Sequence, residues 1–175
     1  MYERERSIAM KLFHASSLII DTPDVYHSRP NLDFGKGFYL TLLYVQAKSY
    51  AQRFLFRNKE AYINEYRLDD DLKRFSTKTF QHYDSEWLDF VSNCRKGIQP
   101  EQFDLVEGGI ANDKVFNTID LYFSGLINRN EALGRLAYEK PNHQLCILNQ
   151  TVITNHLHFI KAEKVARSDH SHVGE

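Results

Sequence analysis

The stretch from Asp33 to Thr41, which reads DFGKGFYLT, says more about the fold than any other part of the chain. Gly35 and Gly37 flank a lysine, and two aromatic residues then open a β-prone run over 38–42. Glycine permits a positive φ angle or the close approach of a ligand to the backbone. The stretch alone is compatible with a β-turn that leads into an ordinary strand. Considered together with the segments described below, the stretch also predicts a ligand-binding loop.

Periodicity on both sides of this stretch predicts short strands interspersed with helices. We expect one face of the 61–68 strand to be more exposed, Ser85 to cap its helix and another helix to start near Asn128. Irregular alternation favours an α+β fold over a doubly wound parallel sheet. No GxGxxG or GxxxxGK[ST] pattern is present, so Rossmann and P-loop folds are excluded. The first expected strand lies in the apolar run 10–20 and ends in a turn at 15–17, and an extended edge follows it. The other expected strands are 38–42, 61–68, 103–106, 144–148 and 157–165, and the expected helices are 43–57, 85–94, 113–123, 129–137 and a turn at 152–155.

Length and composition narrow the class of protein. A chain of 175 residues with 42% hydrophobic content predicts one domain, residues 1–166, followed by a disordered polar tail, residues 167–175. Histidines 170 and 172 fall in this tail and are expected to fray rather than to bind a metal. The net charge of −1 gives no positive field for coating nucleic acid.

The N-terminus and the cysteines indicate the compartment. Residues 1–17 are charged and lack an apolar signal-peptide core, and no run approaches the roughly 20 apolar residues of a membrane span. We therefore expect a cytoplasmic protein with no membrane partner. Cys94 and Cys146 have no zinc-ligand spacing, so we expect two buried free thiols and no metal site.

Two further segments carry residues suited to binding a ligand. His14 ends an apolar strand and is followed by the small residues Ala15 and Ser16, which leave room for a flat ring. Far downstream, Gln144 enters an apolar strand, where a buried amide needs partners for both of its ends. Each feature alone fits an ordinary half-buried polar residue.

Taken together, the three segments resemble the ADP-ribosyltransferase superfamily. LFHAS (residues 12–16) is similar to the first motif, although the family usually has Gly after His, and DFGKGFYLT is similar to the second. NHQLCIL (residues 142–148) takes the place of the third, and ANDKVF (residues 111–116) and PNHQ (residues 141–144) strengthen the resemblance to a family of small bacterial proteins. The resemblance spans about residues 10–162 and implies an ADP-ribosyltransferase-like split antiparallel β core with flanking helices.

The resemblance also implies a function and a set of roles. NAD+ would be the substrate, and ADP-ribose would pass to a protein or nucleic-acid acceptor, as in toxins of toxin–antitoxin or phage-defence modules with a small antitoxin partner. His14 would bind a ribose hydroxyl, the Ala15 backbone the carboxamide, and Tyr39 the nicotinamide ring. Ser16 would support Gln144, the residue at the third-motif position. The glycine loop would complete the site with Gly35, Gly37 and Phe38, and Arg29 or Lys36 would lie against the diphosphate.

The third motif departs from the pattern because it has Gln144 where a glutamate is usual. An amide orients a ribose hydroxyl but does not act as a base at pH 7. Asp113 is the first alternative base, although it also suits an N-cap, and Glu139 is the second. Loss of catalysis is a further alternative, which would leave a nucleotide- or protein-binding module.

A different enzyme remains open as well. His14, His27 or His82 would serve as general acid or base in a nuclease or phosphotransferase.

Overall fold

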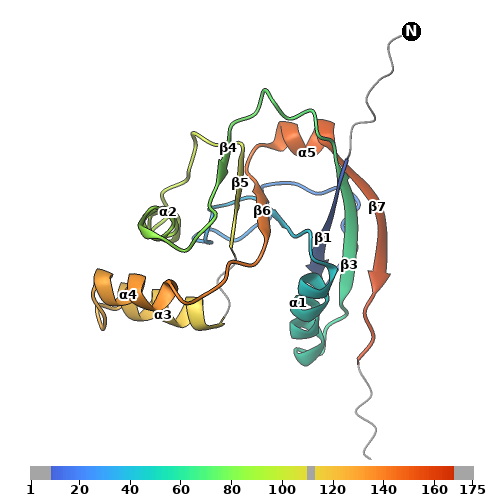
Figure 1. The fold of residues 1–175 in the computed structure, drawn as a ribbon. Coiled ribbons are helices and arrows are strands. Elements are labelled where there is room, and N and C mark those ends of the chain that lie inside the picture. Colours follow the sequence, from blue (N-terminus) through green and yellow to red (C-terminus); the bar gives the residue numbers. More distant parts are fainter. Residues whose placement is uncertain (1–8, 110–112, 168–175) are drawn as a thin grey trace, which may run out of the picture.

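The computed structural model describes residues 9–109 and 113–167, which form an α+β domain with two sheets (Figure 1). The predicted α+β class is confirmed at this level. The strands are β1 (Met10–Ser16), β2 (Phe38–Leu40), β3 (Tyr62–Leu68), β4 (Thr77–Thr79), β5 (Leu105–Gly108), β6 (Gln144–Ile147) and β7 (Leu157–Lys164). The helices are α1 (Tyr44–Phe56), α2 (Ser85–Arg95), α3 (Asp113–Phe123), α4 (Arg129–Leu136) and α5 (Gln150–His156).

The two sheets differ in size and are mostly antiparallel. One has the order β1-β3-β7, and the other has the order β2-β6-β5-β4, in which only β4 and β5 run parallel. An isolated bridge between Phe13 and Thr41 connects them, with N···O distances of 2.8 and 2.9 Å. The middle of β1 and the residue that follows β2 therefore meet where one sheet passes into the other.

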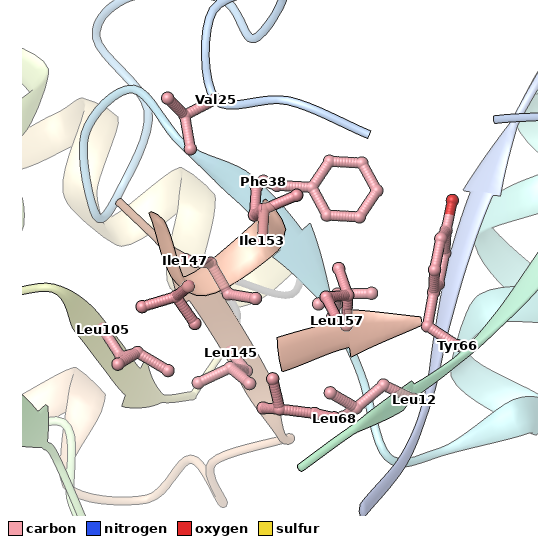
Figure 2. Close-up of a cluster of buried hydrophobic side chains, with 12 residues drawn as sticks. Leu12, Val25, Phe38, Tyr66, Leu68, Leu105, Leu145, Ile147, Ile153 and Leu157 are labelled. Atoms are coloured by element: carbon pink, nitrogen blue, oxygen red, sulfur yellow. The ribbon is translucent and has the colours of Figure 1, made fainter. Parts of the chain in front are cut away.

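An apolar cluster fills the space between the sheets (Figure 2). Leu12, Tyr66 and Leu157 enter it from the first sheet, and Phe38 and Ile147 enter it from the second. The rings of Phe38 and Tyr66 meet edge to face, with centroids 5.5 Å apart. Each fully buried large apolar side chain contributes about 1.5–3 kcal/mol to stability, so this cluster fixes how the sheets face each other.

Helices cover the other face of each sheet. Ala47, Ala51 and Leu55 of α1 pack on the first sheet, where Ile63 of β3 belongs to the same cluster. Helices α2, α3 and α4 cover the second sheet through a cluster that includes Trp87, which is fully buried. Helices thus cover part of each sheet, whereas β4 and most of β7 remain accessible to solvent.

The structure corrects several sequence-based expectations. Strand β3 has one more exposed face, as expected, but the exposure is confined to Arg67, because β3 is central in its sheet and α1 covers Ile63. Asp84 rather than Ser85 caps α2, since its carboxylate accepts from the Trp87 N–H at 3.0 Å. Gly108, expected in a loop, belongs to β5, and the short β4 was not expected. Helix α5 is longer than the expected turn.

The ends of the chain lie partly outside the described residues. Residues 1–8 of the expected domain and 168–175 of the expected tail, including both tail histidines, are not described. Arg167, which the sequence assigns to the tail, donates to the Leu55 carbonyl and to Asn58 at 3.0 and 2.6 Å. Within residues 9–109 and 113–167, no helix has the length and apolar character to cross a membrane.

Candidate functional site

His14 lies on β1 beside the junction of the two sheets. Its Nδ1 is 2.7 Å from the carbonyl oxygen of Tyr39, which only accepts, so Nδ1 carries the proton. The imidazole stacks on the Phe38 ring with centroids 4.6 Å apart. Burial lowers the pKa of His14, although the hydrogen bond to Tyr39 acts in the opposite direction. The ring is therefore neutral at pH 7 and presents Nε2 as an acceptor, which has no partner among the described residues.

Tyr39 holds the glycine loop rather than contacting the His14 ring. Its hydroxyl donates to the Gly35 carbonyl at 2.5 Å and accepts from the Phe34 N–H at 3.1 Å. Burial raises the pKa of this phenol well above its ordinary value. Because Phe38 and Tyr39 are adjacent on a strand, their rings lie on opposite faces of β2, and the His14 ring lies on the Phe38 face.

The loop before β2 is closely packed and cross-linked. Gly35 has a φ of +87°, which L side chains rarely adopt. Gly37 lies so close to β6 that an added Cβ would be 2.6 Å from the Cys146 sulfur. Lys36 exchanges backbone hydrogen bonds with the side-chain amide of Gln99, at 2.9 and 3.0 Å. The loop is thus held in one conformation by its neighbours.

The expected cationic groups lie on the surface of this loop. The side chains of Arg29 and Lys36 are exposed. The Ser28 hydroxyl accepts from the Gly37 N–H at 3.2 Å and donates to the Arg29 carbonyl at 3.1 Å, so both cationic residues belong to one loop assembly. Free exposed cations beside a glycine loop suit a phosphate-bearing ligand.

Gln144 is a near neighbour of Tyr39 in the second sheet. Tyr39 pairs with Cys146, so Gln144 is its diagonal neighbour on the same face, at about 7–8 Å. Gln144 is 8% exposed, so its amide lies close to the buried interior of the second sheet.

The small residues after His14 are engaged locally. Ala15 is buried in the cluster beneath α1. The Ser16 hydroxyl accepts from the Leu18 N–H at 3.2 Å, within its own turn. The structure thus connects Ser16 to the loop that follows β1, and it does not pair Ser16 with Gln144.

The alternative acids, bases and histidines are dispersed. Asp113 is the first residue of α3, and its side chain is outside what the structure describes. Glu139 is half-buried just after α4. His27 pairs with Asp24 at 2.6 Å on the surface, and His82 is exposed. No group of three or more His, Cys, Asp or Glu in the described part of the chain could hold a metal ion.

Sequence reasoning missed two polar residues near the site, one of them fully buried. Asn64, fully buried on β3, accepts from the Ile20 N–H at 2.8 Å and donates to the Leu18 carbonyl at 3.1 Å, and so positions the loop after β1. Glu107 on β5 is 2.8 Å from Nε2 of His143. A polar residue inside each apolar strand was a visible signal in the sequence. The partners of Asn64 and Glu107 are distant in sequence, so their contacts could not be predicted from it.

The fold and the site together define a class: an α+β domain in which β1, β2 and β6 bring a histidine, a tyrosine and a glutamine to one junction of two sheets. Residues 10–159 match a family described as "Protein of unknown function (DUF3990)". The match covers most of the chain, so the protein belongs to this family. Searches of curated proteins and of solved structures gave no significant match.

Proposed function

We propose that the protein is an NAD+-dependent ADP-ribosyltransferase that transfers ADP-ribose to a protein or nucleic-acid acceptor and releases nicotinamide. One observation carries the proposal: three segments far apart in sequence converge at the junction of the sheets. His14 donates to the Tyr39 carbonyl at 2.7 Å, and Tyr39 and Gln144 are diagonal neighbours on one face. The sequence resemblance to ADP-ribosyltransferases rests on the same three segments.

The binding roles follow from the free groups at this junction. Nε2 of His14 would accept a hydrogen bond from a ribose hydroxyl, since its other nitrogen is already engaged. The half-buried Tyr39 ring would contact the nicotinamide. The two rings lie on opposite faces of β2, so a ligand that contacts both would have to cross this strand. Arg29 or Lys36 would neutralise the diphosphate, and the backbone of Ala15 would hold the carboxamide.

The chemical step is a substitution at C1′ of the nicotinamide ribose. The C1′–N bond breaks, the electron pair leaves with nicotinamide, and the acceptor atom bonds to C1′ and loses its proton. Charge at C1′ develops in the transition state, where fixed dipoles and an aromatic wall stabilise it. The Gln144 amide would hydrogen-bond the 2′-hydroxyl and orient this ribose, while the acceptor proton passes to solvent or to Asp113.

Mass spectrometry of purified protein incubated with NAD+ and cell extract tests this proposal. We expect released nicotinamide and an ADP-ribose adduct on the acceptor, and we expect His14→Ala to abolish both while remaining folded. His82→Ala is the matched control, because that histidine is exposed and distant from the described junction contacts. Folded wild-type protein that releases no nicotinamide with any extract would overturn the proposal.

A nucleotide-binding module without catalysis is the second candidate, and the uncharged Gln144 favours it. In that case calorimetry would record NAD+ binding while nicotinamide release stays at the level of the buffer blank. Gln144→Ala would then weaken binding, because it removes the amide that would hydrogen-bond the ligand. We propose a toxin role only for the catalytic protein, with the antitoxin as its partner.

A further inference from the structure

A second site lies at the edge of the larger sheet, beyond the junction described above. An open cavity of about 450 Å³ is lined by the ends of β4 and β5 and by the segment before β6. His143 from this segment contacts the Leu42 backbone, whereas His14 stacks on Phe38. Phe38 and Leu42 are four residues apart, about 13 Å along an extended chain. The cavity therefore does not include His14, but it adjoins Gln144, which follows His143 in the chain and pairs with Gly108 of the lining.

Glu107 and His143 form a hydrogen-bonded pair in the wall of this cavity. Nε2 of His143 is 2.8 Å from Glu107 Oε1, and Nδ1 of His143 accepts from the Leu42 N–H at 3.1 Å. Since Nδ1 is an acceptor, the proton of the neutral ring is on Nε2 and points at the carboxylate. Gln46 of α1 donates to the His143 carbonyl at 2.8 Å and holds the segment in place. The imidazole therefore orients Glu107 through this hydrogen bond.

The carboxylate has no cation to balance it within the cavity. The hydrogen bond from His143 lowers the pKa of Glu107, so this group is ionised at neutral pH and is a weak base. No lysine or arginine is among the described residues that line the cavity. Lys78 is adjacent to Thr79 on β4, but it points to the opposite face, where it pairs with Glu86. The Glu107 side chain is 34% exposed, so a ligand can reach it.

We propose that this cavity binds the guanidinium group of an arginine side chain presented by a polypeptide, with Glu107 as its anionic partner. Thr79, Gln81 and Asn142 supply further polar acceptors, and Leu43 and Pro141 supply apolar surface for the arginine stem. Guanidinium is more weakly hydrated than an ammonium group and offers several donors in one plane, which suits a site with dispersed acceptors. The proposal does not depend on the NAD+ chemistry.

Binding of two small probes to the wild-type protein tests the proposal in the absence of NAD+. The probes are Nα-acetyl-arginine-amide and Nα-acetyl-citrulline-amide, which have nearly the same shape but differ in charge. We expect NMR titration to show shifts of the Glu107 and His143 signals with arginine, and affinity for citrulline that is weaker by about tenfold or more. Equal affinity for the two probes, or no shift with arginine at millimolar concentration, would overturn it.

A pair of charge-removing variants adds a second comparison. Glu107→Gln keeps the shape and removes the charge, and we expect it to weaken arginine binding by about tenfold or more. Glu101→Gln removes an exposed carboxylate outside the cavity lining and should bind like wild type. Circular dichroism checks the fold of both variants. If Glu107→Gln folds and still binds arginine as wild type does, the proposal is contradicted. If this variant does not fold, the comparison of arginine with citrulline on the wild-type protein tests the proposal instead.

Discussion

Gly37→Ala tests whether the loop before β2 is packed as tightly as the structure indicates. The new Cβ would be 2.6 Å from the Cys146 sulfur and 2.6 Å from the Ile147 carbonyl oxygen, where ordinary contact begins at 3.4 Å. One of these atoms is backbone of a paired central strand, and the other belongs to a fully buried side chain. Overpacking of this kind lowers the free energy of unfolding by about 1–3 kcal/mol. Because one of the clashing atoms belongs to the backbone, we expect a loss of about 2–3 kcal/mol for Gly37→Ala.

Thermal unfolding followed by circular dichroism and by Trp87 fluorescence measures this effect. A chain of this size loses about 2–4 °C of Tm per kcal/mol, so we expect a fall of about 4–12 °C. Gly134→Ala is the matched control: nothing lies within 4 Å of its added Cβ in α4, and the helix should gain about 0.5–1 kcal/mol. A Gly37→Ala midpoint equal to or above that of wild type would refute the reasoning.

Three other predictions concern Tyr39, His14 and the two buried cysteines. Tyr39→Phe removes both hydrogen bonds to the 34–35 turn and should lower the free energy of unfolding by about 1–3 kcal/mol in urea titrations. The folded pKa of His14 is below its ordinary 6.5, so the unfolded state binds more protons, and the stability present above pH 6.5 should be lost as pH falls towards the folded pKa. His14→Asn should make the free energy of unfolding less dependent on pH between pH 6.5 and about 5, where most carboxylates stay ionised. An unchanged pH dependence in this variant would contradict the prediction. Burial raises the pKa of Cys94 to about 12 and raises that of Cys146 further, so native protein should not react with a thiol reagent, whereas protein in urea should titrate two thiols.

The sequence predicted best where a local pattern determines the structure. Helix α1 was expected at 43–57 and spans Tyr44–Phe56, because Ala47 and Ala51 repeat at helical spacing and pack together. Helix α4 begins after Asn128, whose capping box with Glu131 is a local signal. The two buried free thiols were also predicted from spacing alone. Short-range patterns therefore located most elements to within a few residues.

Contacts between distant segments were beyond such patterns. The three residues of β4 carry no apolar signal, and they form a strand only because β5 offers a parallel edge 28 residues away, at Thr77 and Leu105. The face to which the Tyr39 ring points depends on the register of β2 with β6, which one sequence does not specify. The pair formed by Glu107 and His143 joins two segments for the same reason. The roles proposed for these residues remain predictions for experiment.

The bridge between Phe13 and Thr41 has a mechanical consequence. A complete ladder distributes an applied load over many hydrogen bonds, whereas here two main-chain bonds at 2.8 and 2.9 Å join the sheets at that crossing. Forces that pull the sheets apart would concentrate on these two bonds and on the side chains packed beside them. We expect the molecule to yield first along this line, with each sheet still intact.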